Sequence, residues 1–182
     1  ANATQQMALF GLMTYFAAYM IESYGWDEAS TAPGLALLGV GAVIGSFVGG
    51  FIAGRARRLD WLAAISLAGG VVVGLLFALA ASAWIVVAMA FVASVLVSVS
   101  MPVLLTLIMH LAGQSRGTAG GMLSTSNQFG SFVGASAGGL MLSLGGYPAV
   151  GLLCLVATVL SASVVGLRMR RSPAFQLGGA GT

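Results

Sequence analysis

Long apolar stretches follow one another along almost the whole chain, and each is broken only by small or isolated polar residues. Each stretch is long enough to cross the hydrocarbon core of a bilayer as an α-helix. The pattern predicts six transmembrane helices, at about residues 5–24, 31–54, 61–81, 84–111, 117–144 and 148–168. We expect one six-helix transmembrane bundle over residues 1–171 and a disordered cytoplasmic tail over residues 172–182.

The composition indicates that the chain is surrounded by lipid and not by water. Hydrophobic residues make up 59% of the chain and charged residues only 6%, whereas roughly a quarter of the residues in a soluble domain are charged. So few charges cannot cover a water-exposed surface, so the expected class is an all-α integral membrane protein. The formal net charge of +3 therefore does not indicate nucleic-acid binding, because in a membrane protein the position of each charge matters more than the sum.

The basic residues predict the orientation in the membrane. Six crossings would put all of them on one side: Arg55, Arg57 and Arg58 after the second segment, Arg116 after the fourth, and Arg168, Arg170 and Arg171 after the sixth. Positive loops are normally cytoplasmic. We therefore predict a bacterial inner (plasma) membrane protein with both termini in the cytoplasm.

Two segments carry the same glycine spacing. Residues 41–50, GAVIGSFVGG, and residues 130–139, GSFVGASAGG, both read GxxxGxxxGG and lie three segments apart. Three crossings reverse the direction of the chain, so the pattern predicts two inverted three-helix repeats. Glycines at every fourth residue share one helix face and allow close packing, although any glycine-rich membrane helix can show this spacing. The predicted helix-packing glycines are Gly41, Gly45, Gly49, Gly130, Gly134 and Gly138.

Two motifs resemble the C-terminal half, helices seven to twelve, of a major facilitator superfamily permease. RGTAGGMLSTSNQFGSFVGASAGG followed by LGGYPAV is similar to the eleventh helix of that family and its turn into the twelfth. GGFIAGRARRLD is similar to the family's basic loop motif, Gly-x-x-x-Asp-Arg-x-Gly-Arg-Arg, with Gly50, Arg55 and Arg58 at motif positions. Gly54 stands where the family has its acidic residue.

The resemblance implies half of a transporter. Segments one and four would face a central cavity, segments two and five would meet a second six-helix bundle, and segments three and six would form the outside. The second bundle would be the missing N-terminal half, a separate chain or a second copy in a homodimer. The expected function is the C-terminal half of an efflux-type secondary transporter of small organic molecules, working by alternating access. The alternative is a structural or assembly subunit of a membrane complex that transports nothing.

A few polar and aromatic residues within the segments are candidates for the substrate cavity. Tyr15 and Tyr19 lie on one face of the first segment, where they could stack on an apolar or aromatic ligand or belong to an interfacial aromatic belt. Ser98 and Met101 lie on the fourth segment beside Pro102, a candidate bending point. Asn127 and Gln128 are amides near the middle of the fifth segment, able to bind a ligand or a neighbouring helix.

Enzyme chemistry has no support in the sequence. The chain contains one His and one Cys, and its carboxylates lie at segment ends or in loops. Nucleophile, general-base and metal-binding constellations cannot be assembled from these residues. We therefore predict no catalytic residues, no metal and no cofactor. The expected partners are the lipid bilayer, a second bundle and a small-molecule substrate, with no nucleic acid.

Overall fold

The computed structural model describes residues 2–53, 59–78 and 82–164, and all regular structure in these ranges is helical. A short 3-10 turn, Gly113–Ser115, joins the fourth helix to the fifth. The α-helices are α1 (Asn2–Tyr24), α2 (Glu28–Ala53), α3 (Leu59–Ala78), α4 (Ala83–Ala112) and α5 (Arg116–Val164). The expected tail, Arg55 and Arg58 lie outside the described residues.

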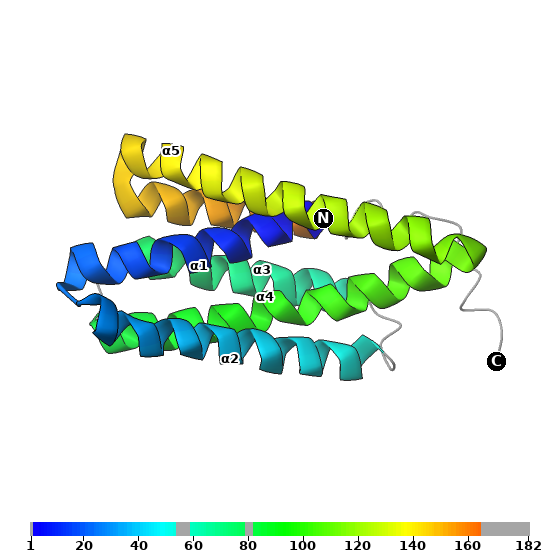
Figure 1. The fold of residues 1–182 in the computed structure, drawn as a ribbon, viewed down its shortest axis with the longest axis horizontal. Coiled ribbons are helices and arrows are strands. Elements are labelled where there is room, and N and C mark those ends of the chain that lie inside the picture. The colour runs from blue at the N-terminus through cyan, green and yellow to red at the C-terminus, as the bar shows by residue number, and fades with distance from the viewer. Residues whose placement is uncertain (1, 54–58, 79–81, 165–182) are drawn as a thin grey trace.

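The described residues form five α-helical elements where six helices were predicted, and the fifth element, α5, contains a kink. The difference lies in α5, which is not straight. Gly145 (φ −149°, ψ 15°) and Gly146 (φ 68°, ψ −163°) have non-helical backbone angles, and the chain reverses there (Figure 1). Gly146 tolerates a positive φ because it has no Cβ, and Pro148 suits the start of a new helical run. The first and second arms of α5, 116–144 and 147–164, correspond to the fifth and sixth predicted segments.

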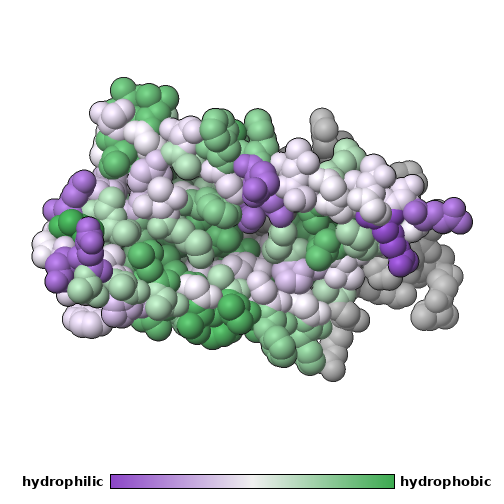
Figure 2. Space-filling view, in the orientation of Figure 1, coloured by the Kyte–Doolittle hydropathy of each residue, from purple (hydrophilic) through white to green (hydrophobic). Residues whose placement is uncertain are grey.

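Apolar helices dominate the described residues. Three helical stretches are long and apolar enough to cross a membrane by length and composition: Glu28–Ala53, Ala83–Thr106 and Gly113–Ser163. Figure 2 shows apolar surface along the middle of the molecule, with hydrophilic residues concentrated at its two ends and in one small patch between them. This distribution is the one expected of a protein embedded in lipid, and it confirms the predicted all-helical membrane class.

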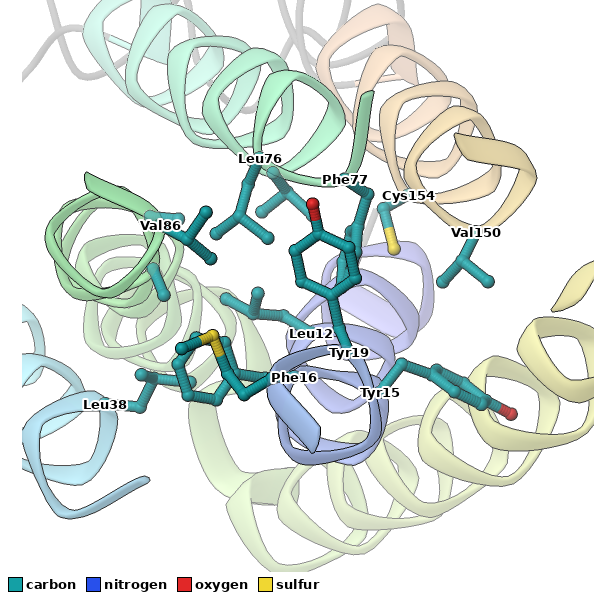
Figure 3. Close-up of a cluster of buried hydrophobic side chains, with 14 of the residues drawn as sticks. Leu12, Tyr15, Phe16, Tyr19, Leu38, Leu76, Phe77, Val86, Val150 and Cys154 are labelled. Carbon is teal, nitrogen blue, oxygen red and sulfur yellow. The ribbon is translucent and has the colours of Figure 1, made fainter. Parts of the chain in front are cut away.

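The core lies between α1 and the helices around it. Leu12, Phe16 and Met20 on α1 are fully buried. In Figure 3, Phe16 points toward Leu38 of α2, and Tyr19 lies near Leu76 and Phe77 of α3. α1 contacts every other helix in the bundle. It is therefore the central helix of the described fold.

The connection from α1 to α2 carries polar residues at one end of the bundle. Asp27 precedes α2 and accepts a 2.8 Å hydrogen bond from the Ser30 N–H, the arrangement of an N-cap residue. Hydrogen bonds from Ser30 lower the pKa of the Asp27 carboxyl. The ionised carboxylate complements the positive end of the α2 dipole. Nearby, the Tyr147 hydroxyl donates a 2.7 Å hydrogen bond to Glu22, which joins the end of α1 to the turn of α5.

The glycines of α2 pack against α4. Gly41, Gly45 and Gly49 are all buried. A Cβ on Gly41 would lie 3.1 Å from the Phe91 carbonyl oxygen, and one on Gly45 would collide with the Val95 carbonyl. Gly49 meets the Val99 carbonyl in the same way. The two helices run in the same direction (Figure 1), and their backbones come close at every fourth residue.

The glycines of the first arm of α5 pack against α1 in the same manner. Gly130 faces the carbonyl of Ala3, and a Cβ on Gly134 would lie 2.7 Å from the Met7 carbonyl oxygen. Gly138 faces the ring of Tyr15. α1 and this arm also run in the same direction as each other, opposite to α2 and α4 (Figure 1).

This placement corrects one expectation. The family resemblance implied that the glycine-bearing segments meet a second six-helix bundle, and we expected the glycine faces to be the contact surface. Both glycine faces are instead filled by helices of this chain, because a smooth face is most closely matched by the nearest parallel backbone. The outward faces of α2 and α5 carry large side chains, such as Phe47 (81% exposed) and Phe132 (70% exposed). The glycine faces are therefore not available for contact with a second bundle in the described fold.

Candidate functional site

A recess opens between α1, α2 and α4. It is lined by Gln6 and Leu9 of α1, Ala42 and Ser46 of α2, and Val97, Ser98 and Met101 of α4. Two of the predicted cavity residues, Ser98 and Met101, therefore lie side by side in its wall. Among the described residues, the lining combines one amide and two hydroxyls with aliphatic and thioether groups and includes no charged side chain. Such a mixture of apolar wall and few polar groups is typical of a small-molecule site.

The Ser98 hydroxyl has no hydrogen-bond partner among the described residues, although the residue is only 5% exposed. Several other hydroxyls in the described helices donate to carbonyl oxygens. Thr106 donates to Pro102 at 2.8 Å, Ser131 donates to Asn127 at 2.9 Å and Ser94 donates to Leu38 at 2.6 Å. A buried hydroxyl without a partner is costly, so Ser98 differs from its neighbours in a way that packing does not explain.

Pro102 adds a second polar group at the same position. Proline has no N–H, so the helical hydrogen bond that would normally end on the Ser98 carbonyl cannot form. α4 nevertheless continues through Pro102 without interruption. Ser98 thus carries both an unpaired hydroxyl and a carbonyl without its usual helical donor.

The chain matches the family model described as "Major Facilitator Superfamily" over residues 1–180. It belongs to the major facilitator superfamily. No curated protein and no solved structure matched the chain. The match confirms the resemblance found in the sequence. A half-length unit of this superfamily is consistent with a chain of 182 residues.

As a member of the major facilitator superfamily, the protein is assigned to membrane transporters rather than to enzymes. The described residues also contain no group of three or more His, Cys, Asp or Glu side chains that could hold a metal ion. The recess is a candidate functional site in the described part of the fold.

Tyr15 does not line the recess, contrary to its prediction as a cavity residue. Its side chain is 8% exposed and points toward α5 (Figure 3), where the hydroxyl donates to the Ala135 carbonyl and the ring faces Gly138. The residue fills the groove that the glycine leaves open. Tyr15 is thus a packing residue between α1 and α5.

Tyr19 is also part of the packed core instead of the cavity. Its ring lies 5.4 Å from Phe77, 4.8 Å from Tyr147 and 5.6 Å from Tyr24, measured between ring centroids. These edge-on and tilted contacts are favourable aromatic geometries. In the described fold Tyr19 is therefore packed among aromatic rings of the bundle interior.

The amide and loop candidates lie elsewhere. Gln128 is exposed and Asn127 is half-buried on the first arm of α5, and neither lines the recess. Gly50 is exposed near the end of α2, with open space around it. Its motif partners Arg55 and Arg58 lie outside the described residues, so the loop motif stays a prediction.

Sequence reasoning missed Gln6 and Ser46. Gln6 lines the recess but lies nine residues before Tyr15, which is about 180° around the helix, so the face predicted from the two tyrosines does not include it. Ser46 is the only polar residue in GAVIGSFVGG, and that isolation was the signal that could have found it.

Proposed function

We propose that this chain is the C-terminal half of a secondary transporter that moves small organic molecules by alternating access, with the recess as part of its substrate path. Superfamily membership supports transport. The observation that carries the site is the buried, unpaired Ser98 hydroxyl in a recess formed by α1, α2 and α4. A protein that only held a complex together would gain nothing from that hydroxyl.

In this proposal the chain crosses the membrane six times, with the two arms of α5 counted separately. The two glycine-packed helix pairs support an inverted repeat, because the second glycine copy packs on α1 as the first packs on α4. The end of α1 and the start of α5, which begins at Arg116, lie at opposite ends of the bundle (Figure 1). This separation supports cytoplasmic termini in a bacterial inner membrane.

A second six-helix bundle would complete the transporter. The proposed substrates are small organic molecules, and the proposed direction of transport is efflux. The recess opens between α1, α2 and α4, and in this proposal the second bundle supplies a facing wall. Rocking of the two bundles would then open the recess to one side of the membrane at a time.

The native mass of the protein tests this arrangement. The protein would be extracted from its own membrane in a mild, non-denaturing detergent, and the mass of the particle would be measured with bound detergent subtracted. We expect a particle that contains two six-helix bundles, whether from a longer chain, a separate chain or a second copy. A particle with the mass of one six-helix bundle would contradict the proposed transport and favour the role of a non-transporting membrane subunit.

A further inference from the structure

We infer that the recess selects an uncharged, hydroxyl-bearing apolar molecule, such as an alcohol or a phenol, and that Ser98 is the residue that recognises the hydroxyl. This inference deepens the proposed function, because it names the substrate class of the same site. The ligand is a transport substrate only if the proposed function holds, but binding of the ligand can be measured whether or not the chain transports it.

The absence of charge in the lining argues for a neutral ligand. Among the described residues, those that line the recess are all uncharged. The described acidic residues at or near the α1–α2 connection, Glu22, Asp27 and Glu28, are exposed, as is Arg116 at the start of α5, and none of them lines the recess. A charged group that entered the recess would lose its hydration without gaining an opposite charge, which is strongly unfavourable.

The Ser98 hydroxyl and the Gln6 amide argue for a hydroxyl in particular, because both residues line the recess. The serine hydroxyl can donate one hydrogen bond and accept others, and the oxygen of the Gln6 amide can accept. An alcohol or phenol oxygen can accept from the serine hydroxyl while it donates its own proton to an acceptor. A carbonyl or ether ligand could use only the first of these bonds.

The rest of the wall fits the remainder of such a molecule. Leu9, Val97, Ala42 and the thioether of Met101 offer apolar contact beside the serine. Methionine adapts its shape and contacts aromatic rings favourably, so both alkyl and phenyl bodies could pack against it. Gln6 and Ser46 provide further polar groups in the same lining.

Photolabelling of the purified full chain in detergent tests the inference. The probe is an eight-carbon alkyl alcohol with a diazirine on its chain, used beside alkylammonium and alkylcarboxylate probes of the same length. Labelled positions are found by mass spectrometry. We expect the alcohol to label residues of the recess, unlabelled octanol to compete for those positions, and the two charged probes to label them at least about fivefold less.

Three variants give the test its controls. Ser98→Ala should weaken recess labelling by the alcohol about tenfold, as expected for loss of one or two hydrogen bonds, and should leave the unfolding temperature unchanged or higher. Ala42→Leu should also abolish labelling, because it fills the recess while keeping Ser98. Ser143→Ala should change nothing, since the Ser143 hydroxyl is exposed and already donates to the Leu140 carbonyl at 2.8 Å.

The inference is overturned if the charged probes label the recess as strongly as the alcohol, if Ser98→Ala labels like the native chain, or if the alcohol labels only the lipid-facing surface. These outcomes do not depend on a second bundle. A native particle of one bundle that still binds the alcohol through Ser98 would therefore refute transport and support the ligand assignment.

Discussion

The Gly45→Ala substitution is expected to lower the unfolding temperature of the detergent-solubilised protein by about 5–10 °C, for a cost of about 1–3 kcal/mol. A Cβ at this position would collide with the Val95 carbonyl and lie 2.9 Å from the Ser98 Cβ. A backbone carbonyl cannot rotate away as a side chain can. α2 and α4 would have to separate, and this separation would also disturb the recess beside Ser98.

Matched glycines on the same helix provide the control. Gly39 and Gly50 have no atom within 4 Å of the position that a Cβ would take. Gly39→Ala and Gly50→Ala should therefore be neutral or stabilise the protein by up to about 1 kcal/mol, because alanine favours the helix more than glycine does. Equal effects at Gly45 and at these two positions would show that helix propensity, and not the contact with α4, sets the stability.

Gly134→Ala is expected to destabilise the other helix pair to a similar extent, about 1–3 kcal/mol. Its Cβ would lie 2.7 Å from the Met7 carbonyl oxygen and 2.8 Å from the Met7 Cα. Because these neighbours are backbone atoms, shortening the Met7 side chain should not restore stability. Thermal unfolding in mild detergent measures both effects, with Gly121→Ala as the control in open space on the same arm.

Gly138 lies on the same arm as Gly134 but faces a side chain instead of a backbone. Its neighbours are atoms of the Tyr15 ring, so Gly138→Ala should be rescued in part by Tyr15→Ala, which clears the space. Rescue of Gly134→Ala by a smaller residue at position 7, or failure of rescue at Gly138, would contradict the packing described for α1 and α5.

The sequence was sufficient for the helices and for the family because both depend on local pattern. The expected break between residues 144 and 148 coincides with Gly146, whose positive φ suits glycine, and with Pro148, which begins the second arm. The glycine spacing also identified which face of α2 is smooth. It could not tell which helix fills that face, because spacing along one helix carries no information about its neighbour.

The candidate site was only partly predictable from the sequence. Ser98 and Met101 were proposed because polar groups and a proline in an apolar helix need an explanation, and the structure places both residues in the lining of the recess. Tyr15 and Tyr19 were misplaced because large aromatic side chains can satisfy a hydroxyl inside a bundle as well as in a cavity, as Tyr15 does by donating to the Ala135 carbonyl. Whether a tyrosine of α1 lies in a cavity or in the packed core depends on how α1 is rotated about its own axis. The residue pattern of one helix does not determine that rotation to within one residue.

The most direct test of a water-open recess in a lipid-embedded bundle is thiol labelling at two positions of α2. Ser46 lines the recess, whereas Ile44, 43% exposed, is two residues away and so about 200° around the helix. Cys154 is the only cysteine in the chain and is buried, so Cys154→Ala gives a clean background.

Each single cysteine would be treated, in native membranes and from both sides, with a membrane-impermeant maleimide. The reagent reacts with the thiolate, which forms only where water reaches the sulfur. We expect Ser46→Cys to be labelled and Ile44→Cys to remain unlabelled. Equal labelling at the two positions, or labelling at Ile44→Cys alone, would contradict the existence of the recess as a water-accessible site.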